Sequence, residues 1–135
     1  MDEQKITLAK YRFEKAAEGL KNSKQSYDNK LLSYSISSSY YAIFHSVRIL
    51  FAFEGIDSKS HKGASHLFNL HFVKTKLLPG KMNEILSGAF EMRLDSDYED
   101  FFFASKEEAK EQLDNAEFFL NEILKFIKQN YHIAL

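Results

Sequence analysis

The stretch EMRLDSDYEDFFF, residues 91–103, places a cation, acids and a phenol directly before three phenylalanines. Arg93 and Asp97 are four residues apart, so they can pair on one helix face if a helix continues that far. On a protein surface such a pair contributes only about 0.3–0.5 kcal/mol. Beside residues 101–103, Arg93, Asp97 and Tyr98 could instead form a partly buried polar site, because buried charge must be satisfied by partners. The residues leave two interpretations open, a helix end at the surface or a polar site held against the core.

A second polar group interrupts the most apolar stretch of the chain, AIFHSVRILFAF at residues 42–53. Tyr41, His45 and Arg48 lie at positions i, i+4 and i+7, so they share one face of a helix. They are either core residues with satisfied hydrogen bonds or one wall of a polar site. In the second case, Arg93 and Asp97 on another helix would form the opposite wall.

The histidines do not have the spacing of a metal site. His61, His66 and His71 are each five residues apart, and five residues turn a helix by about 500°, which leaves successive side chains about 140° apart. A di-metal carboxylate bundle needs two Glu-x-x-His motifs, and the sequence has none. Cysteine is also absent, which excludes thiolate ligands. We expect no metal and no cofactor.

Length and composition indicate one folded domain over residues 1–135, since 44% of the residues are hydrophobic and 15% are aromatic. His45 and Arg48 interrupt a stretch that is too short to span a membrane. The chain starts with a charged segment that lacks the apolar core of a signal peptide. We therefore expect a soluble, cytoplasmic protein without a membrane segment.

The net charge is only −1, so no global field attracts nucleic acid. The charges are nevertheless unevenly distributed, because residues 58–83 include no acid and acids dominate residues 91–114. The basic segment is either a solvated face, a local surface that attracts phosphate, or a docking surface for a partner of opposite charge. Its lysines are Lys59, Lys62, Lys74, Lys76 and Lys81.

Apolar residues recur at helical spacing along the chain and predict helices over residues 5–22, 28–54, 63–74, 81–94 and 106–130. Asp28 is the expected N-cap of the second helix, and Ser105 with Glu108 forms a capping box for the last. No stretch alternates as a strand does. The expected fold is all-α, an antiparallel bundle of four long helices with an additional short helix. The phenylalanines at 101–103 are expected to anchor the loop before Ser105 on this bundle.

Three segments together resemble the small proteins of the HEPN domain family. They are SYYAIFHSVRILF (39–51), DSKSHKGASHLFNLHFVKTKLLP (57–79) and FEMRLDSDYEDF (90–101). The resemblance implies a HEPN-like bundle that forms a homodimer. It also implies a nucleotide or RNA ligand, or a minimal nucleotidyltransferase partner within a toxin–antitoxin system.

Other members of this superfamily are metal-independent ribonucleases that carry Arg, four to six residues, and then His. Here the positions after Arg93 at that spacing are Tyr98, Glu99 and Asp100, and none of them is histidine. Ribonuclease activity is therefore an alternative in which His45 or His61 replaces the missing base. A module that serves only dimerisation is a further alternative.

The residue spacing and the family resemblance together suggest a set of site residues. Catalytic roles are assigned to Arg93, Asp97, Tyr98 and His45. Ligand binding is assigned to Tyr41, Arg48, His61 and Lys62.

Overall fold

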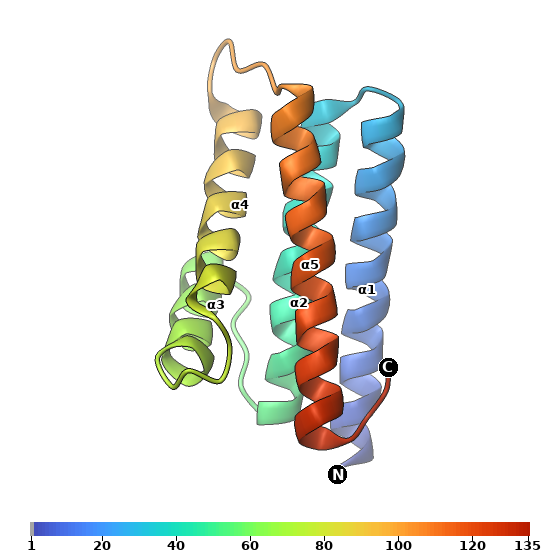
Figure 1. Ribbon diagram of the computed structural model, residues 1–135, viewed down its shortest axis with the longest axis vertical. Coiled ribbons are helices and arrows are strands. Elements are labelled where there is room, and N and C mark those ends of the chain that lie inside the picture. Colours follow the sequence, from blue (N-terminus) through green and yellow to red (C-terminus); the bar gives the residue numbers. More distant parts are fainter. Residues whose placement is uncertain (1) are drawn as a thin grey trace.

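The computed structural model describes residues 2–135, which form a bundle of α-helices joined by short connections (Figure 1). No strand occurs within these residues, which confirms the all-α prediction. The helices are α1 (Glu3–Asp28), α2 (Leu32–Glu54), α3 (His61–Phe68), the π-helical turn η1 (Asn69–Val73), α4 (Gly80–Tyr98) and α5 (Lys106–Tyr131). None of them has the length and apolarity that a membrane crossing requires.

The central helix is α2, which packs against α1, α4 and α5. A helix that is apolar around most of its circumference must be surrounded by other helices. The side chains of α2 accordingly fill the core, and those of Ile43, Val47 and Leu50 are fully buried. The α3–η1 segment lies beside the N-terminal end of α4, near the end of the bundle that holds both termini (Figure 1).

Small residues let α1 and α2 approach closely. A Cβ atom added at Gly19 would lie 3.1 Å from the Ala42 backbone nitrogen and 3.2 Å from the Ser38 carbonyl oxygen. One helical turn further along, the Ser23 hydroxyl lies 2.6 Å from that of Ser39 and donates to the Ser35 carbonyl at 2.9 Å. These hydrogen bonds satisfy polar groups that would be costly to bury alone.

The serine contacts explain why the predicted boundary between the first two helices is wrong. The sequence pattern ends the first helix at residue 22, but α1 continues to Asp28. Ser23 is fully buried and hydrogen-bonded to α2. This polar residue therefore lies in the interface between α1 and α2 and not in a connection. Asp28 therefore ends α1, and Leu31 takes the N-cap position of α2 without a side-chain hydrogen bond.

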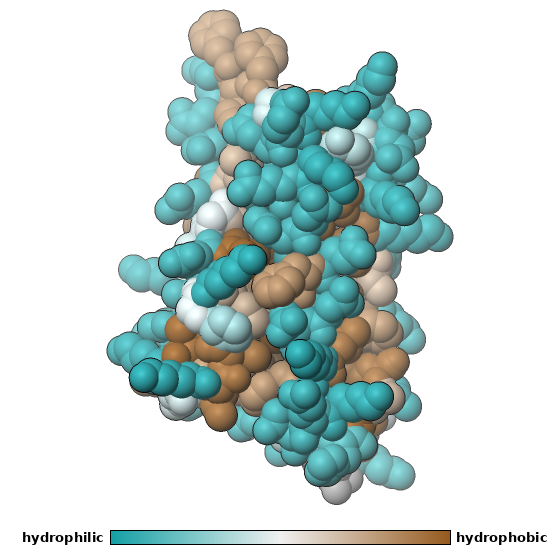
Figure 2. Space-filling view, viewed as in Figure 1, coloured by the Kyte–Doolittle hydropathy of each residue, from teal (hydrophilic) through white to brown (hydrophobic). Residues whose placement is uncertain are grey.

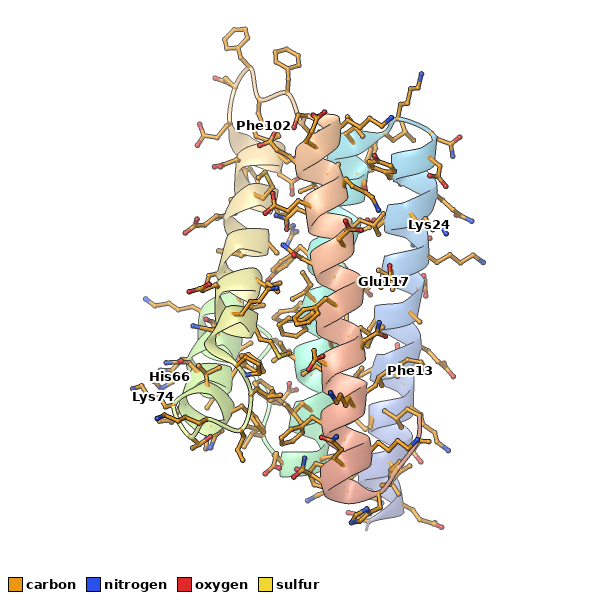
Figure 3. The ribbon with its side chains drawn as sticks, viewed as in Figure 1. Phe13, Lys24, His66, Lys74, Phe102 and Glu117 are labelled. Carbon is orange, nitrogen blue, oxygen red and sulfur yellow. The ribbon has the colours of Figure 1, made fainter. Side chains whose placement is uncertain are left out.

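The expectation that the phenylalanines anchor the loop before α5 is wrong for Phe101 and Phe103, whereas Phe102 is half-buried. The Ser105–Glu108 capping box forms as predicted, but the side chains of Phe101 and Phe103 are 92% and 84% exposed. The reason is that α4 ends at Tyr98 rather than at Leu94, which carries the loop about 6 Å further along the bundle axis. Apolar side chains project beyond the bundle at the end where α4 leads into α5 (Figure 2). Phe102 lies in the connection between these two helices (Figure 3).

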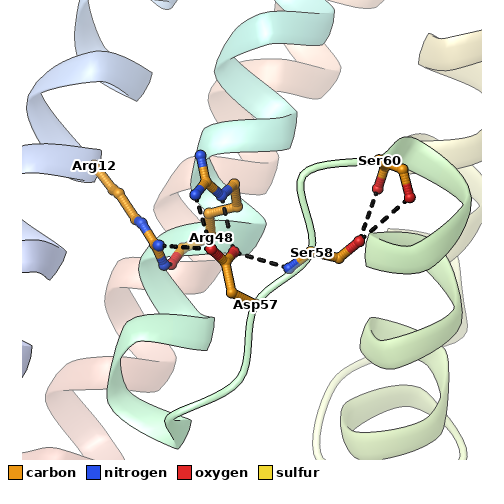
Figure 4. Close-up of polar contacts among 5 residues, drawn as sticks. All are labelled: Arg12, Arg48, Asp57, Ser58 and Ser60. Carbon is orange, nitrogen blue, oxygen red and sulfur yellow. Dashed lines mark hydrogen bonds and ion pairs between the residues drawn. The ribbon is translucent and has the colours of Figure 1, made fainter.

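An ion-pair cluster fixes the loop between α2 and α3 (Figure 4). Arg48 donates to Asp57 through Nε at 3.0 Å and through Nη2 at 2.9 Å, and Arg12 donates to the same carboxylate at 3.1 Å. Arg12 also donates to the Arg48 carbonyl at 2.7 Å, which ties α1 to α2. The loop therefore leaves α2 along a fixed path.

Two serines complete this connection. The Ser58 backbone N–H donates to Asp57 at 2.9 Å, and the Ser58 hydroxyl contacts Ser60. Ser60 is the N-cap of α3, because its hydroxyl accepts from the Gly63 backbone N–H at 3.1 Å. His61 is consequently the first residue of α3 and has a defined position relative to α2.

Replacement of Asp57 by Asn should destabilise the fold, because Arg12 and Arg48 would face each other without a counter-charge. We expect a loss of about 1–3 kcal/mol in the free energy of unfolding. The lower half of that range is expected because 37% of the Asp57 side chain is exposed to solvent. Asp95→Asn removes the same charge from an exposed residue and serves as the control in chemical denaturation.

The same variant should change the pH dependence of stability. Hydrogen bonds from Arg48 are the main cause that lowers the pKa of Asp57. A carboxyl whose pKa is lowered on folding stabilises the protein above its ordinary pKa, and this contribution is lost as the pH falls through the lowered value. The wild type should thus lose more stability than Asp57→Asn below about pH 4. Equal losses in the two proteins would contradict the role assigned to the cluster.

Candidate functional site

A cleft of about 760 Å³ lies between α1, α2, the start of α3 and α4. All the site residues expected from the sequence line it except Tyr98, which is 74% exposed at the end of α4. Those that line it are Tyr41, His45, Arg48, His61, Lys62, Arg93 and Asp97. Further lining residues are Glu18, Gly19, Asn22, Ser37, Ser38, Tyr40, Phe44, Lys59 and Phe90.

The α2 wall carries Tyr41, His45 and Arg48 on one helix face, as their spacing predicts. The Tyr41 and His45 rings lie 4.2 Å apart between centroids. Arg48 reaches over to Asp57, so its Nε and Nη2 donors are already occupied within the protein. This side of the cleft therefore offers aromatic surface and an imidazole more than free guanidinium donors.

His45 is an uncharged imidazole at neutral pH. Burial lowers its pKa to about 4, and the nearby Arg48, Arg12 and Lys15 lower it further in that order. Its Nδ1 atom is buried and has no hydrogen-bond partner within residues 2–135. His45 can act as a neutral polar group in the cleft, but it is a weak base.

The opposite wall is built around a stack of His61 and Phe90. Their rings are nearly parallel, with an interplanar angle of 7° and 3.7 Å between centroids. The Tyr40 hydroxyl lies 3.1 Å from His61 Nδ1, which links α2 to the start of α3. Burial raises the pKa of Tyr40 to about 12 and lowers the pKa of His61. Both side chains are therefore neutral at pH 7.

Arg93 extends from α4 toward the ring of Tyr40. Its guanidinium carbon lies 5.3 Å from the centre of the Tyr40 ring, within the range of a cation–π contact. Its Nε lies 3.4 Å from an oxygen of Asp97, so the predicted pair forms. The terminal nitrogen atoms of Arg93 make no hydrogen bond within the described residues. Arg93 can therefore offer two N–H groups to an anionic ligand.

Lysines add positive charge at the α3 side of the cleft. Lys59 and Lys62 both line it, and no ion pair neutralises either of them within residues 2–135. Both belong to the acid-free segment 58–83. Residues 2–135 include no cluster of histidines and carboxylates that could hold a metal ion. The cleft thus combines the open terminal edge of a guanidinium and two lysines with aromatic rings.

Sequence reasoning missed several residues that build the site. Arg12 and Asp57 are 45 positions apart, and no local pattern pairs them. Tyr40 and Phe90 have the spacing of ordinary core residues, so their contacts with His61 emerge only once the helices pack. His66 and His71, in contrast, do not line the cleft.

Comparison with known proteins agrees with this architecture. The HEPN domain family matches residues 9–127. A candidate toxin of Methanocaldococcus jannaschii, MJ0142, is 31% identical over 84% of this chain and 78% of its own length. A second candidate toxin of that organism, MJ0605, is 31% identical over 84% of both chains. The UPF0332 protein of Thermotoga maritima is 30% identical over 93% of this chain and 95% of its own. The chain belongs to the HEPN domain family.

Proposed function

We propose that this HEPN module binds a nucleotide or the nucleotide units of RNA in the cleft around Arg93. The observation that carries the proposal is the free guanidinium edge of Arg93 beside the His61–Phe90 stack. Arginine binds phosphate oxygens through paired N–H groups, which makes such contacts stronger than neutral hydrogen bonds. Lys59 and Lys62 would attract the same phosphate from the α3 side.

The aromatic residues of the cleft suit the other half of a nucleotide. A base can stack on exposed aromatic faces with little dependence on its identity. Tyr41 is 42% exposed and lines the cleft beside His45, so its ring is accessible to a base. The volume of about 760 Å³ lies within the range of small-molecule sites.

The titratable groups favour binding over RNA cleavage. General acid–base catalysis is most effective when the pKa of the catalytic group is near the working pH. In this cleft the pKa of His45 falls to about 4 and that of Tyr40 rises to about 12. Tyr98 stands at the position of the expected histidine but does not line the cleft. Ribonuclease activity is therefore the second candidate rather than the first.

A role in a toxin–antitoxin system with a minimal nucleotidyltransferase partner forms part of the proposal. Its support is the family and the two relatives whose names describe candidate toxins. Homodimerisation is also proposed, because large apolar side chains are exposed at the α4–α5 end. Exposed apolar side chains that gather at one end of a protein often mark an interaction surface. These side chains are Tyr34, Tyr98, Phe101 and Phe103.

Arg93→Gln should weaken nucleotide binding at least ten-fold, because it removes the charged, bidentate contact to phosphate. The measurement is calorimetric titration with adenosine 5′-monophosphate and with a short single-stranded RNA. Lys128→Gln, a change of the same charge on α5 outside the cleft, is the control. Binding that is unchanged in Arg93→Gln would exclude the cleft as the phosphate site.

The same proteins should be incubated with labelled RNA to separate binding from cleavage. We expect no cleavage above the background of the Arg93→Gln variant. Cleavage by the wild type that disappears in Arg93→Gln would establish the ribonuclease alternative. Absence of both binding and cleavage would leave a module that serves dimerisation.

The double variant Phe101→Ser/Phe103→Ser should shift the protein from dimer to monomer. The reason is that these side chains offer more apolar surface than any other residues at that end of the bundle. Sedimentation equilibrium over a range of concentrations measures the change. Leu77→Ser, at a side chain that is 54% exposed in the turn before α4, is the matched control. A wild-type protein that is monomeric at all concentrations would refute this use of the patch.

A further inference from the structure

Two arginines line the cleft, and their acidic partners hold them in different ways. Arg48 is 17% exposed and makes two short hydrogen bonds to Asp57, at 2.9 and 3.0 Å. Arg93 is 41% exposed and makes one long contact to Asp97, at 3.4 Å. A bidentate, partly buried pair is much harder to separate than a single exposed contact. The Asp57 pair is therefore structural, whereas the Asp97 pair can open.

A second contact fixes Asp97 at the cleft. The Ser37 hydroxyl on α2 donates to Oδ1 of Asp97 at 3.3 Å, while Oδ2 faces Arg93. All three residues line the cleft, so the carboxylate bridges its α2 and α4 walls. If Asp97 separated from Arg93, its hydrogen bond with Ser37 would still hold it beside any group that Arg93 binds.

The cation–π contact holds the guanidinium at the same place. Arg93 lies over the Tyr40 ring, and Tyr40 is 5% exposed and bonded to His61. A phosphate that binds Arg93 must therefore approach within a few ångströms of Asp97. The negative charge of Asp97 then acts on the ligand as well as on the arginine.

We propose that Asp97 determines which phosphate groups the cleft accepts, by repelling a doubly charged terminal phosphate more than a singly charged phosphodiester. This inference rests on the proposed binding of nucleotides at Arg93. Coulomb repulsion is proportional to the charge of the ligand, so the penalty for a dianion is about twice that for a monoanion. A terminal phosphate carries a charge close to −2 above its second pKa of about 6, whereas a diester carries −1.

Other charged residues of the cleft act on both kinds of ligand. Glu18 on α1 is the other carboxylate that lines it, and Arg93, Lys59 and Lys62 are cations that it presents to a ligand. These cations attract a monoanion and a dianion alike. The effect of Asp97 is therefore isolated by comparing Asp97→Asn with the wild type for each ligand.

The test compares two adenine ligands at pH 8 and constant ionic strength. Adenosine 5′-monophosphate presents a dianionic phosphate, and the dinucleotide adenylyl-(3′,5′)-adenosine presents a monoanionic diester. Titration calorimetry gives the affinity of each ligand for the wild type, Asp97→Asn and Asp95→Asn. Asp97→Asn is isosteric with the native side chain, and Asp95→Asn makes the same charge change on an exposed residue of α4 outside the cleft.

We expect Asp97→Asn to bind the monophosphate about ten-fold more tightly than the wild type, and the dinucleotide about three-fold more tightly. Asp95→Asn should change each affinity less than two-fold. Asp97→Asn should also retain its fold, with a melting temperature within about 3 °C of the wild type, since the pair is exposed.

Equal gains for the two ligands, no gain, or a loss of affinity in Asp97→Asn would overturn the selectivity assigned to Asp97 while leaving binding at Arg93 intact. The same gains in Asp95→Asn would reduce the effect to net charge and also overturn it. Failure of every protein to bind either ligand would refute the proposed function itself, and Asp97 would then have no ligand to select.

Discussion

The carboxylate of Asp57, held between Arg12 and Arg48, is the constraint on which the cleft depends. It accepts hydrogen bonds from two guanidinium groups and fixes the loop that leaves α2. Because Ser60 then starts α3, the loop places His61 against Phe90 and Tyr40. This aromatic cluster joins α2, α3 and α4, and Arg93 lies over it. The position of the candidate ligand-binding arginine thus follows from an ion pair more than thirty residues away in the sequence.

The polar groups in and next to the cleft are of two kinds. Arg12, Arg48 and Asp57 satisfy one another and stabilise the fold. Arg93, Lys59 and Lys62 retain charge that a ligand can use, while burial keeps His45 neutral at neutral pH. Aromatic rings beside free cations fit a phosphate attached to a base better than they fit a proton-transfer site. This arrangement supports nucleotide binding by a member of the HEPN domain family.

Periodicity in the sequence was sufficient to predict the bundle, the shared face of Tyr41, His45 and Arg48, and the pairing of Arg93 with Asp97. These features depend on contacts within one helix, whose geometry is fixed by the backbone. Features that depend on packing between helices could not be predicted in this way. Buried hydrogen bonds made Ser23 a helical residue, and the Arg12–Asp57 contact joins segments with no common pattern.

The loop before α5 illustrates the same limit. Three consecutive phenylalanines suggested an anchor in the core, because apolar side chains usually pack inside. The additional turn of α4 instead carries Phe101 and Phe103 past the end of the bundle and leaves Tyr98 outside the cleft. A helix boundary that shifts by one turn was enough to change the environment of these residues. The site residues within regular helices were therefore easier to place than those at helix ends.

The central claim is that the cleft between α1, α2, the start of α3 and α4 is the nucleotide site. Amide chemical-shift mapping tests this claim most directly. Isotope-labelled protein would be titrated with adenylyl-(3′,5′)-adenosine, and the shift of each backbone amide recorded. We predict that the largest shifts cluster at Ser37, Tyr41, His61 and Arg93, which belong to three different helices around one cleft. Shifts that are absent at saturating dinucleotide, or that cluster on α5 away from the cleft, would contradict the account.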